Sequence, residues 1–276
     1  MKGTLKFIPA THVSLEELAE AFNAAFAGYF YPQQKTADSL AERVRHEQLA
    51  LQHSLLAYED KRFVGLALLG LRGSDGWCGG FGIVPELRGR GLASELMREF
   101  MARARGCGVK RLSLEVLARN TPARRLYERA GMQIMRDLLI LERAGEMTLR
   151  KNLKDLKEAA PKFLLGHFEQ LHREPPAWQR DLAALLVTGN MRGLYLGEMS
   201  APRAYALFIA RPDGIIHLID LAAMDSEHAN ALSAGIMQLP GKLKIINEPE
   251  DSLFAAALTL NGFQETDRQH EMMCEM

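Results

Sequence analysis

The chain has 276 residues, of which 47% are hydrophobic and 25% are charged, and its formal net charge at pH 7 is zero. This composition is typical of a globular protein, and the length suits two domains or one large one. The balanced charge, with acidic residues interleaved among the basic ones, argues against a nucleic-acid partner.

The patterns of cysteine, histidine and hydropathy argue against a disulfide-rich protein, a metalloprotein and a membrane protein. The three cysteines, Cys78, Cys107 and Cys274, form no C-x-x-C pair, which disfavours a disulfide framework and indicates a reducing compartment. No two histidines have the spacing of a metal site, and no apolar run approaches the length that spans a membrane. The sequence therefore predicts a cytoplasmic protein with no metal, no nucleic acid and no membrane partner.

The first half of the chain reads as alternating strands and helices. Apolar periodicity predicts strands at 5–8, 54–59, 62–71, 77–84, 112–116 and 132–141, and helices at 15–26, 37–49, 94–105 and 122–130. Ser14 and Glu17 have the spacing of a capping box for the first helix. This order of elements predicts an α/β fold with a mixed sheet.

A glycine-rich turn follows the strand at 77–84. The segment from Ile83 to Ala93 reads I-V-P-E-L-R-G-R-G-L-A, and a helix follows it directly. Successive main-chain N–H groups in such a turn, together with the positive end of the helix, bind anions. A side chain at Gly89 or Gly91 would hold a phosphate away from the backbone. Because the third glycine of a dinucleotide fingerprint and the P-loop pattern are both missing, the turn predicts a phosphate ligand of another kind.

A second motif runs from Asn120 to Met132 and reads N-T-P-A-R-R-L-Y-E-R-A-G-M. Asn120 has the position of a helix N-cap, and Gly131 has that of a C-cap glycine. Together with R-x-x-G-x-A from Arg88, this motif resembles the GNAT superfamily of acyl-CoA-dependent N-acyltransferases. That superfamily combines V-x-P-x-x-R-x-x-G-x-[GA] with N-x-x-A-x-x-L-Y-x-x-x-G in the same order.

The resemblance implies a fold, a cofactor and a set of site residues. Two neighbouring parallel strands of the mixed sheet would splay apart around acetyl-CoA, and Tyr127 would be the catalytic general acid toward the departing thiolate. The implied cofactor-binding residues are Ile83, Val84, Arg88, Gly89, Arg90, Gly91, Leu92, Ala93 and Asn120. From the residues alone, Tyr127 could instead pack between helix and sheet, and Asn120 could serve as a helix cap.

The second half of the chain repeats the first faintly, at an offset of 131 residues that aligns Gly262 with Gly131. The copy lacks the arginine and glycines of the phosphate turn, and it has Leu258 in place of Tyr127. We therefore expect two GNAT-like α/β domains in tandem. The predicted division is a catalytic, acetyl-CoA-binding domain at 1–145, a linker at 146–160, and a degenerate domain at 161–276 without a phosphate loop.

The catalytic chemistry is only partly specified. The resemblance implies a β-bulge in the strand at 77–84 that exposes a main-chain N–H to polarise the thioester carbonyl. Gly79, Gly80 and Gly82 would make such a bulge easy, although glycines also occur in strands without a function. The strand at 77–84 contains no acid or histidine, so no general base is assigned. A water chain and a residue of the loop at 29–31 are both alternatives for the general base. Glu115 is better interpreted as a structural partner than as a base.

The function that the sequence favours is transfer of an acetyl group from acetyl-CoA to a primary amine of a small molecule. A non-catalytic acyl-CoA sensor or scaffold remains open, as does a transferase that acts on protein amines. No motif identifies the acceptor, and a homodimer is a possible assembly.

Overall fold

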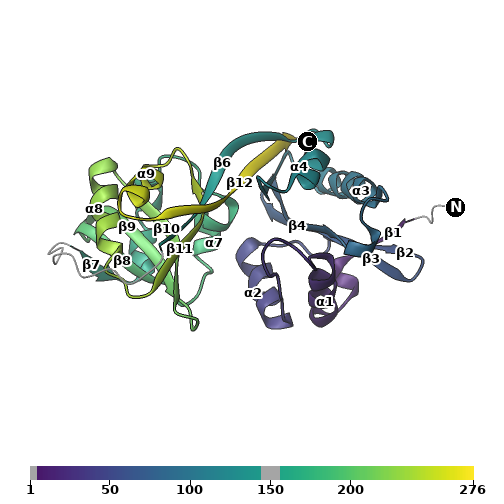
Figure 1. The fold of residues 1–276 in the computed structure, drawn as a ribbon, viewed down its shortest axis with the longest axis horizontal. Coiled ribbons are helices and arrows are strands. Elements are labelled where there is room, and N and C mark those ends of the chain that lie inside the picture. Colours follow the sequence, from purple (N-terminus) through teal and green to yellow (C-terminus); the bar gives the residue numbers. More distant parts are fainter. Residues whose placement is uncertain (1–4, 144–155) are drawn as a thin grey trace. The chain divides into compact units, whose positions relative to one another are not determined.

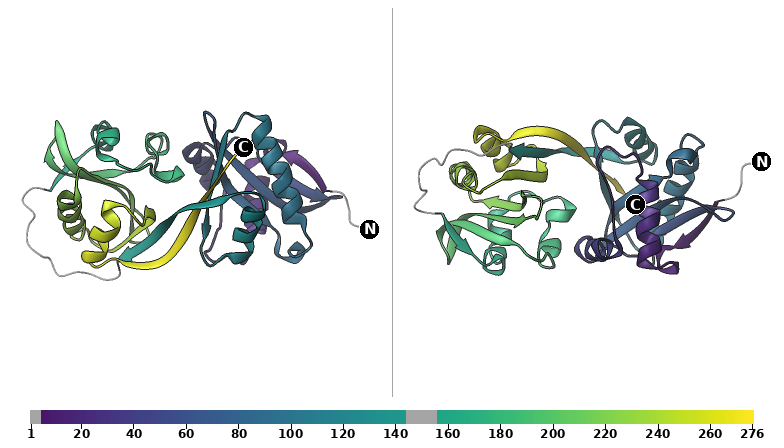
Figure 2. Two further views of the ribbon diagram at one scale, coloured as in Figure 1. Left: turned by 90° about the horizontal axis from the view of Figure 1, so that it is seen from above. Right: turned by 60° about the horizontal axis from the view of Figure 1, so that its bottom comes forward.

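The structure, a computed structural model, describes residues 5–143 and 156–276, which divide into two compact units (Figure 1). Unit 1 comprises the residues up to 135 together with 271–276, and unit 2 comprises residues 136–270. The chain therefore leaves unit 1 within strand β6 (Gln133–Arg143) and returns within strand β12 (Gln264–Glu275), the teal and yellow arrows of Figure 2.

These bounds differ from the division predicted at residues 145 and 161. Residues 136–143 lie in unit 2 rather than in the first domain, and residues 271–276 lie in unit 1 rather than in the second. The physical reason is that alternation predicts which face of a strand is apolar, but not which sheet the strand joins. Of the predicted linker, residues 146–155 lie outside the described residues, and Lys157–Ala159 forms strand β7.

Unit 1 contains a mixed sheet with helices on both faces. The order of its strands is β1-β2-β3-β4-β5-β12, in which β1 to β4 are antiparallel neighbours and β4 and β5 are parallel. Helices α1 and α2 lie on one face, and α3 and α4 lie on the other (Figure 1). The bounds are β1 Leu5–Pro9, α1 Leu15–Ala25, α2 Ala37–Glu47, β2 Leu55–Glu59, β3 Arg62–Arg72, β4 Asp75–Ile83, α3 Leu92–Gly106, β5 Arg111–Leu117 and α4 Thr121–Arg129.

Local sequence sets the helix ends in unit 1. The predicted capping box is confirmed, because the Ser14 hydroxyl accepts the Glu17 N–H at 3.2 Å and the Glu17 carboxylate accepts the Ser14 N–H at 2.8 Å. The Asn120 side-chain oxygen accepts the Ala123 N–H at 3.4 Å, so α4 begins at its predicted cap. Gly131 follows this helix with a φ of 92°, a left-handed conformation that favours glycine.

The largest core of unit 1 lies between its sheet and the helices α3 and α4. Leu96 and Phe100 of α3 are fully buried there, against Leu112 of β5. The C-terminal strand contributes to the same core, since Met272 is 0% exposed and Cys274 is 9% exposed. Unit 1 is therefore completed by the last residues of the chain.

Unit 2 repeats this plan around a sheet of order β12-β6-β11-β10-β9-β8-β7, in which β10 and β11 are parallel. One buried cluster packs α8 and α9 against the sheet, and a second packs α5, α6 and α7. The bounds are α5 Pro161–Leu165, α6 Phe168–Leu171, α7 Leu182–Leu185, β8 Arg192–Glu198, β9 Ala201–Ala210, β10 Ile215–Ala223, α8 Ser226–Ile236, β11 Lys242–Pro249 and α9 Leu253–Leu260.

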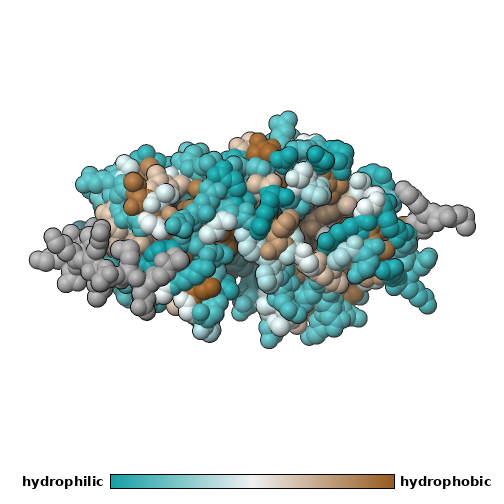
Figure 3. Space-filling model, in the orientation of Figure 1, coloured by the Kyte–Doolittle hydropathy of each residue, from teal (hydrophilic) through white to brown (hydrophobic). Residues whose placement is uncertain are grey.

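The face of the molecule seen in Figure 3 is mostly hydrophilic, with brown residues in scattered groups. The described part of the chain holds no helix that combines the length and the apolar character needed to cross a bilayer.

Candidate functional site

The centre of unit 1 is a fork between the parallel strands β4 and β5. The two strands pair only at their first residues, from Asp75 opposite Arg111 to Trp77 opposite Ser113, and then diverge. The Trp77 indole N–H donates to the Glu115 carboxylate at 2.8 Å, just where the pairing ends. Glu115 is thus a structural partner, as predicted, and the fork has the splay that the resemblance implies.

Strand β4 is interrupted by a bulge inside this fork. Cys78 and Gly80 oppose consecutive residues of β3, so Gly79 is the extra residue. A Cβ atom at Gly79 would lie 2.5 Å from the Trp77 ring and 2.8 Å from Leu49, so a larger residue would require these side chains to shift. The predicted bulge is confirmed, and the packing around its centre favours glycine.

Beyond β4, the glycine-rich turn presents unpaired amides. Gly89 and Gly91 have φ angles of 78° and 83°, and Gly91 is the N-cap of α3. The Ser94 N–H is the first in α3 to find a main-chain acceptor, at 3.1 Å from the Gly91 carbonyl. In the part of the chain that the structure describes, the five preceding N–H groups, of residues 89–93, have no acceptor. Five successive free donors at a helix N-terminus form a site for an anion.

Two arginines shape this turn in different ways. The Arg88 guanidinium donates to the main-chain carbonyls of Ile83 at 2.9 Å and of Ala25 and Ala27 at 3.2 Å, so it joins the turn to the end of α1. Its side chain therefore supports the turn rather than facing a ligand. The Arg90 side chain is 44% exposed and donates to both oxygens of Glu59, at 3.0 and 3.2 Å.

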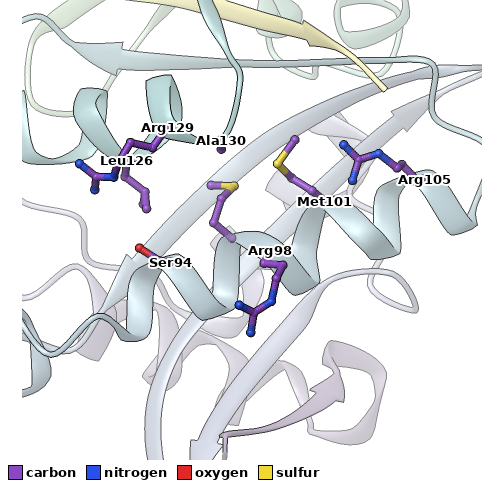
Figure 4. Close-up of a pocket in the computed structure, with 8 residues that line it drawn as sticks. Ser94, Arg98, Met101, Arg105, Leu126, Arg129 and Ala130 are labelled. Carbon is purple, nitrogen blue, oxygen red and sulfur yellow. The ribbon is translucent and has the colours of Figure 1, made fainter.

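A basic cavity of about 250 Å³ lies between α3 and α4 (Figure 4). Its lining includes Ser94 in the first turn of α3, close to the free amides, and three arginines, Arg98, Arg105 and Arg129. Among the described residues, no carboxylate forms an ion pair with any of the three. Unpaired guanidinium groups in a recess suit a polyanion.

Tyr127 lies at the base of the fork, on the α4 side of the sheet. Its side chain is 7% exposed, and its ring meets Phe81 of β4 edge to face, with ring centroids 6.2 Å apart. Burial raises the pKa of Tyr127 well above its usual range, and the neighbouring Cys78 and Tyr29 raise it further. Tyr127 therefore keeps its proton at physiological pH and is a hydrogen-bond donor.

The remaining predicted cofactor residues are placed mainly by their backbones. Ile83, Val84 and Leu92 are buried in the core of unit 1, and Ala93 is half-buried beside it. The Val84 N–H is already bonded to the Val64 carbonyl at 2.9 Å, so these apolar side chains hold the turn in place.

An ion pair that sequence reasoning missed lies on the other face of the bulge. Arg43 and Glu47 of α2 are 2.6 Å apart, and the Arg43 guanidinium donates to the Gly79 carbonyl. Burial raises the pKa of Glu47, although Arg43 opposes this shift. Their spacing of four residues on one helix is a signal for an ion pair, but nothing in the sequence points it at β4.

The aromatic loop after α1 packs on itself and on Arg119. Phe26, Tyr29 and Phe30 form consecutive edge-to-face contacts with centroids 5.4 Å apart, and the Arg119 guanidinium lies 4.8 Å from the Phe30 ring centre. This loop is therefore anchored by apolar and cation–π contacts.

Unit 2 has a comparable fork that is bridged by charged side chains. Its strands β10 and β11 pair from Ile215 to Leu218 and then diverge. Buried Arg180 lies 3.6 Å from Asp220 of β10 and also donates to Glu248 of β11. The β10–α8 connection has no glycine, and there the Asp225 carboxylate accepts the His228 N–H at 2.9 Å.

No group of three or more potential metal ligands occurs within residues 5–143 and 156–276.

Comparison with known sequences gives one family and two similar proteins. Residues 15–132 match the Acetyltransferase (GNAT) family. An uncharacterised N-acetyltransferase of Bacillus subtilis (strain 168) is 42% identical over 53 residues, which are 19% of this chain and 34% of that protein. A second protein of this strain, provisionally named a ribosomal protein bS18-alanine N-acetyltransferase, is 28% identical over 122 residues, 44% of this chain and 78% of that protein. The chain thus spans about a third of the first relative.

Two solved structures resemble nearly the whole chain. A tandem GNAT protein from the clavulanic acid biosynthesis pathway has a TM-score of 0.67 at 12% identity, over 99% of this chain and 98% of its own. A GCN5-related N-acetyltransferase from Sphaerobacter thermophilus has a TM-score of 0.70 at 14% identity, over 98% of this chain and 95% of its own. At these identities the likeness shows the fold, and it confirms the predicted pair of GNAT-like α/β domains.

Proposed function

We propose that unit 1, in which residues 15–132 match the Acetyltransferase (GNAT) family, transfers an acetyl group from acetyl-CoA to a primary amine of a small molecule. The observation that carries this proposal is the run of five unpaired amides at residues 89–93, because it offers a pyrophosphate more donors than a structural turn needs.

The neighbouring features fit the rest of the cofactor. The three unpaired arginines of the α3–α4 cavity add positive charge beside the turn, as a polyanionic ligand requires. The fork between β4 and β5 leads from the turn toward Tyr127 and the bulge at Gly79. We therefore assign the phosphates to the turn and the cavity, and the thioester to the fork.

The reaction needs little covalent chemistry from the protein. The amine nitrogen bonds to the carbonyl carbon, the C–S bond breaks with its electron pair on sulfur, and the nitrogen loses a proton while the sulfur gains one. The products are an amide and the CoA thiol. A main-chain N–H at the bulge stabilises the oxyanion, and the Tyr127 hydroxyl donates a hydrogen bond to the departing sulfur. Because its pKa is raised, Tyr127 is better suited to donate a hydrogen bond than to give up its proton.

We assign no cofactor to unit 2. Its fork is bridged by Arg180, and the Asp225 carboxylate occupies the helix N-terminus where a phosphate would need free amides. One molecule of acetyl-CoA per chain is therefore expected.

One observation favours a second acceptor class. The B. subtilis relative that is 28% identical is named for the alanine of a ribosomal protein, which presents an α-amino group on a peptide. A panel that contains both small amines and short peptides with a free N-terminus separates the two acceptors. An acyl-CoA-binding protein without turnover would bind the cofactor and acetylate neither.

Calorimetry with acetyl-CoA on the full-length protein tests the proposal. Gly91→Val should weaken binding by about 10- to 100-fold, since a side chain in the turn removes charge-assisted hydrogen bonds to the phosphates. Gly73→Val is the matched control, because Gly73 also has a positive φ, of 58°, but lies in the β3–β4 turn. Equal affinity of the Gly91 variant and wild type would reject the phosphate turn, and no binding by wild type would reject the function.

A further inference from the structure

The bulge in β4 is held from the face opposite Tyr127. Arg43 of α2 donates to the Gly79 carbonyl, and its guanidinium also lies 5.1 Å from the centre of the Phe22 ring of α1. Glu47 lies one turn along the same helix, with its carboxylate 2.6 Å from the Arg43 Nε. The Arg43 and Glu47 side chains are only 16% and 11% exposed, so the guanidinium is fixed on three sides.

The hydrogen bond from Arg43 to the bulge also sets the direction of a main-chain N–H group in the fork. The Gly79 carbonyl and the Gly80 N–H belong to one planar peptide unit and point in opposite directions. The Gly80 N–H faces the Cys78 thiol, whose sulfur is a weak hydrogen-bond acceptor that the stronger thioester oxygen would replace. Cys78 in turn neighbours Tyr127 in the core on the α3 and α4 side of the sheet. The carbonyl end of this peptide therefore faces α2, while the N–H end faces the proposed thioester position.

Two glycines alone would leave this peptide free to rotate. Glycine has no Cβ atom and accepts many backbone conformations, so a Gly-Gly bulge needs an external contact to keep one orientation. A charged donor on the carbonyl provides that contact, and it also polarises the peptide so that its N–H becomes a stronger donor.

We propose that Arg43, clamped by Glu47, is a positioning residue for acetyl transfer that directs the Gly80 N–H at the thioester oxygen. This inference rests on the proposed function. It adds to unit 1 a residue from α2 that touches neither acetyl-CoA nor the amine, and it explains why a buried ion pair lies behind the bulge. The carboxylate of Glu47 holds the guanidinium in place and takes no part in the proton transfer.

Three variants of the full-length protein test this role. Arg43→Met removes the donor and keeps a long side chain, Arg43→Lys keeps the charge, and Arg45→Met removes an exposed arginine from the same turn of α2 as a matched control. The measurements are the acetyl-CoA Kd by calorimetry, release of the CoA thiol at saturating acetyl-CoA with the amine panel, and amide hydrogen exchange of the peptide that contains residues 78–81.

We expect Arg43→Met to lower kcat by about 10- to 100-fold, the scale of a misdirected oxyanion donor, while the Kd stays within about threefold. Exchange at the bulge should become faster, Arg43→Lys should recover part of kcat, and Arg45→Met should match wild type throughout. A wild-type kcat in Arg43→Met would overturn the positioning role, as would a parallel loss of kcat and affinity. If wild type itself binds no acetyl-CoA, the proposed function fails, and the positioning role fails with it.

Discussion

Met272 offers a direct test of the composition of unit 1, because it lies 137 positions after Met135, where the main part of that unit ends, and yet is 0% exposed in its core. Met272→Ala removes three heavy atoms from a packed site. Large-to-small core substitutions of this kind cost about 2–5 kcal/mol, and complete burial favours about 3 kcal/mol here. With a urea m-value of about 2–3 kcal/mol/M, the midpoint of unfolding of unit 1 should fall by about 1 M.

The assay needs a signal from unit 1 alone. The chain has two tryptophans, Trp77 in unit 1 and Trp178 in unit 2, so the Trp178→Phe background leaves the buried Trp77 as the only indole. Its fluorescence in urea then follows the unfolding of unit 1. Met135→Ala is the matched control, because that side chain is 54% exposed and its loss should change the free energy of unfolding by less than about 0.5 kcal/mol. Equal midpoints for the two variants would refute the assignment of the C-terminal strand to unit 1.

Two further predictions concern the site and the pH dependence. Tyr127→Phe keeps the edge-to-face contact with Phe81 but removes the donor, so kcat should fall by about 100-fold while the acetyl-CoA Kd is unchanged; an unaffected kcat in a thiol-release assay would remove Tyr127 from the reaction. In unit 2, burial, with help from Arg211 and Lys244, lowers the pKa of His217 to about 4. Since the unfolded chain takes up this proton near its ordinary pKa of about 6.5, stability should fall as pH drops from about 6.5 to about 4. The full difference corresponds to about 3 kcal/mol, which solvent screening of a half-exposed ring reduces to about 1–2 kcal/mol, so His217→Gln should flatten the decline of the urea midpoint between pH 7 and pH 4.5.

Much of unit 1 could be predicted because its signals are local. The Ser14 capping box, the bulge at Gly79 and the turn at Gly89 and Gly91 each depend on residues within a few positions of one another, and the structure has all three. The Asn120 cap belongs to the same class.

What the sequence did not predict depends on long-range pairing. The partner of a strand is set by packing between distant segments. The passage of β6 and of β12 from one unit into the other therefore has no local signature in the sequence. The hydrogen bond from Arg43 to the Gly79 carbonyl joins a helix to a strand 36 positions away. A search for a general base among the residues of β4 alone does not find it. A fragment ending at residue 145, which the predicted division suggests as a domain, would lack Met272 and so could not serve as an isolated unit 1.

The return of the chain to unit 1 also sets an order of events during synthesis. Unit 2 is a continuous stretch, residues 136–270, and every residue that it needs is made before the final strand segment. The main part of unit 1 precedes unit 2 in the chain, but its core is complete only once residues 271–276 have been made. A chain that stops before residue 271 therefore carries the glycine-rich turn without the strand segment that completes its core, and synthesis of that segment becomes a condition for a stable unit 1.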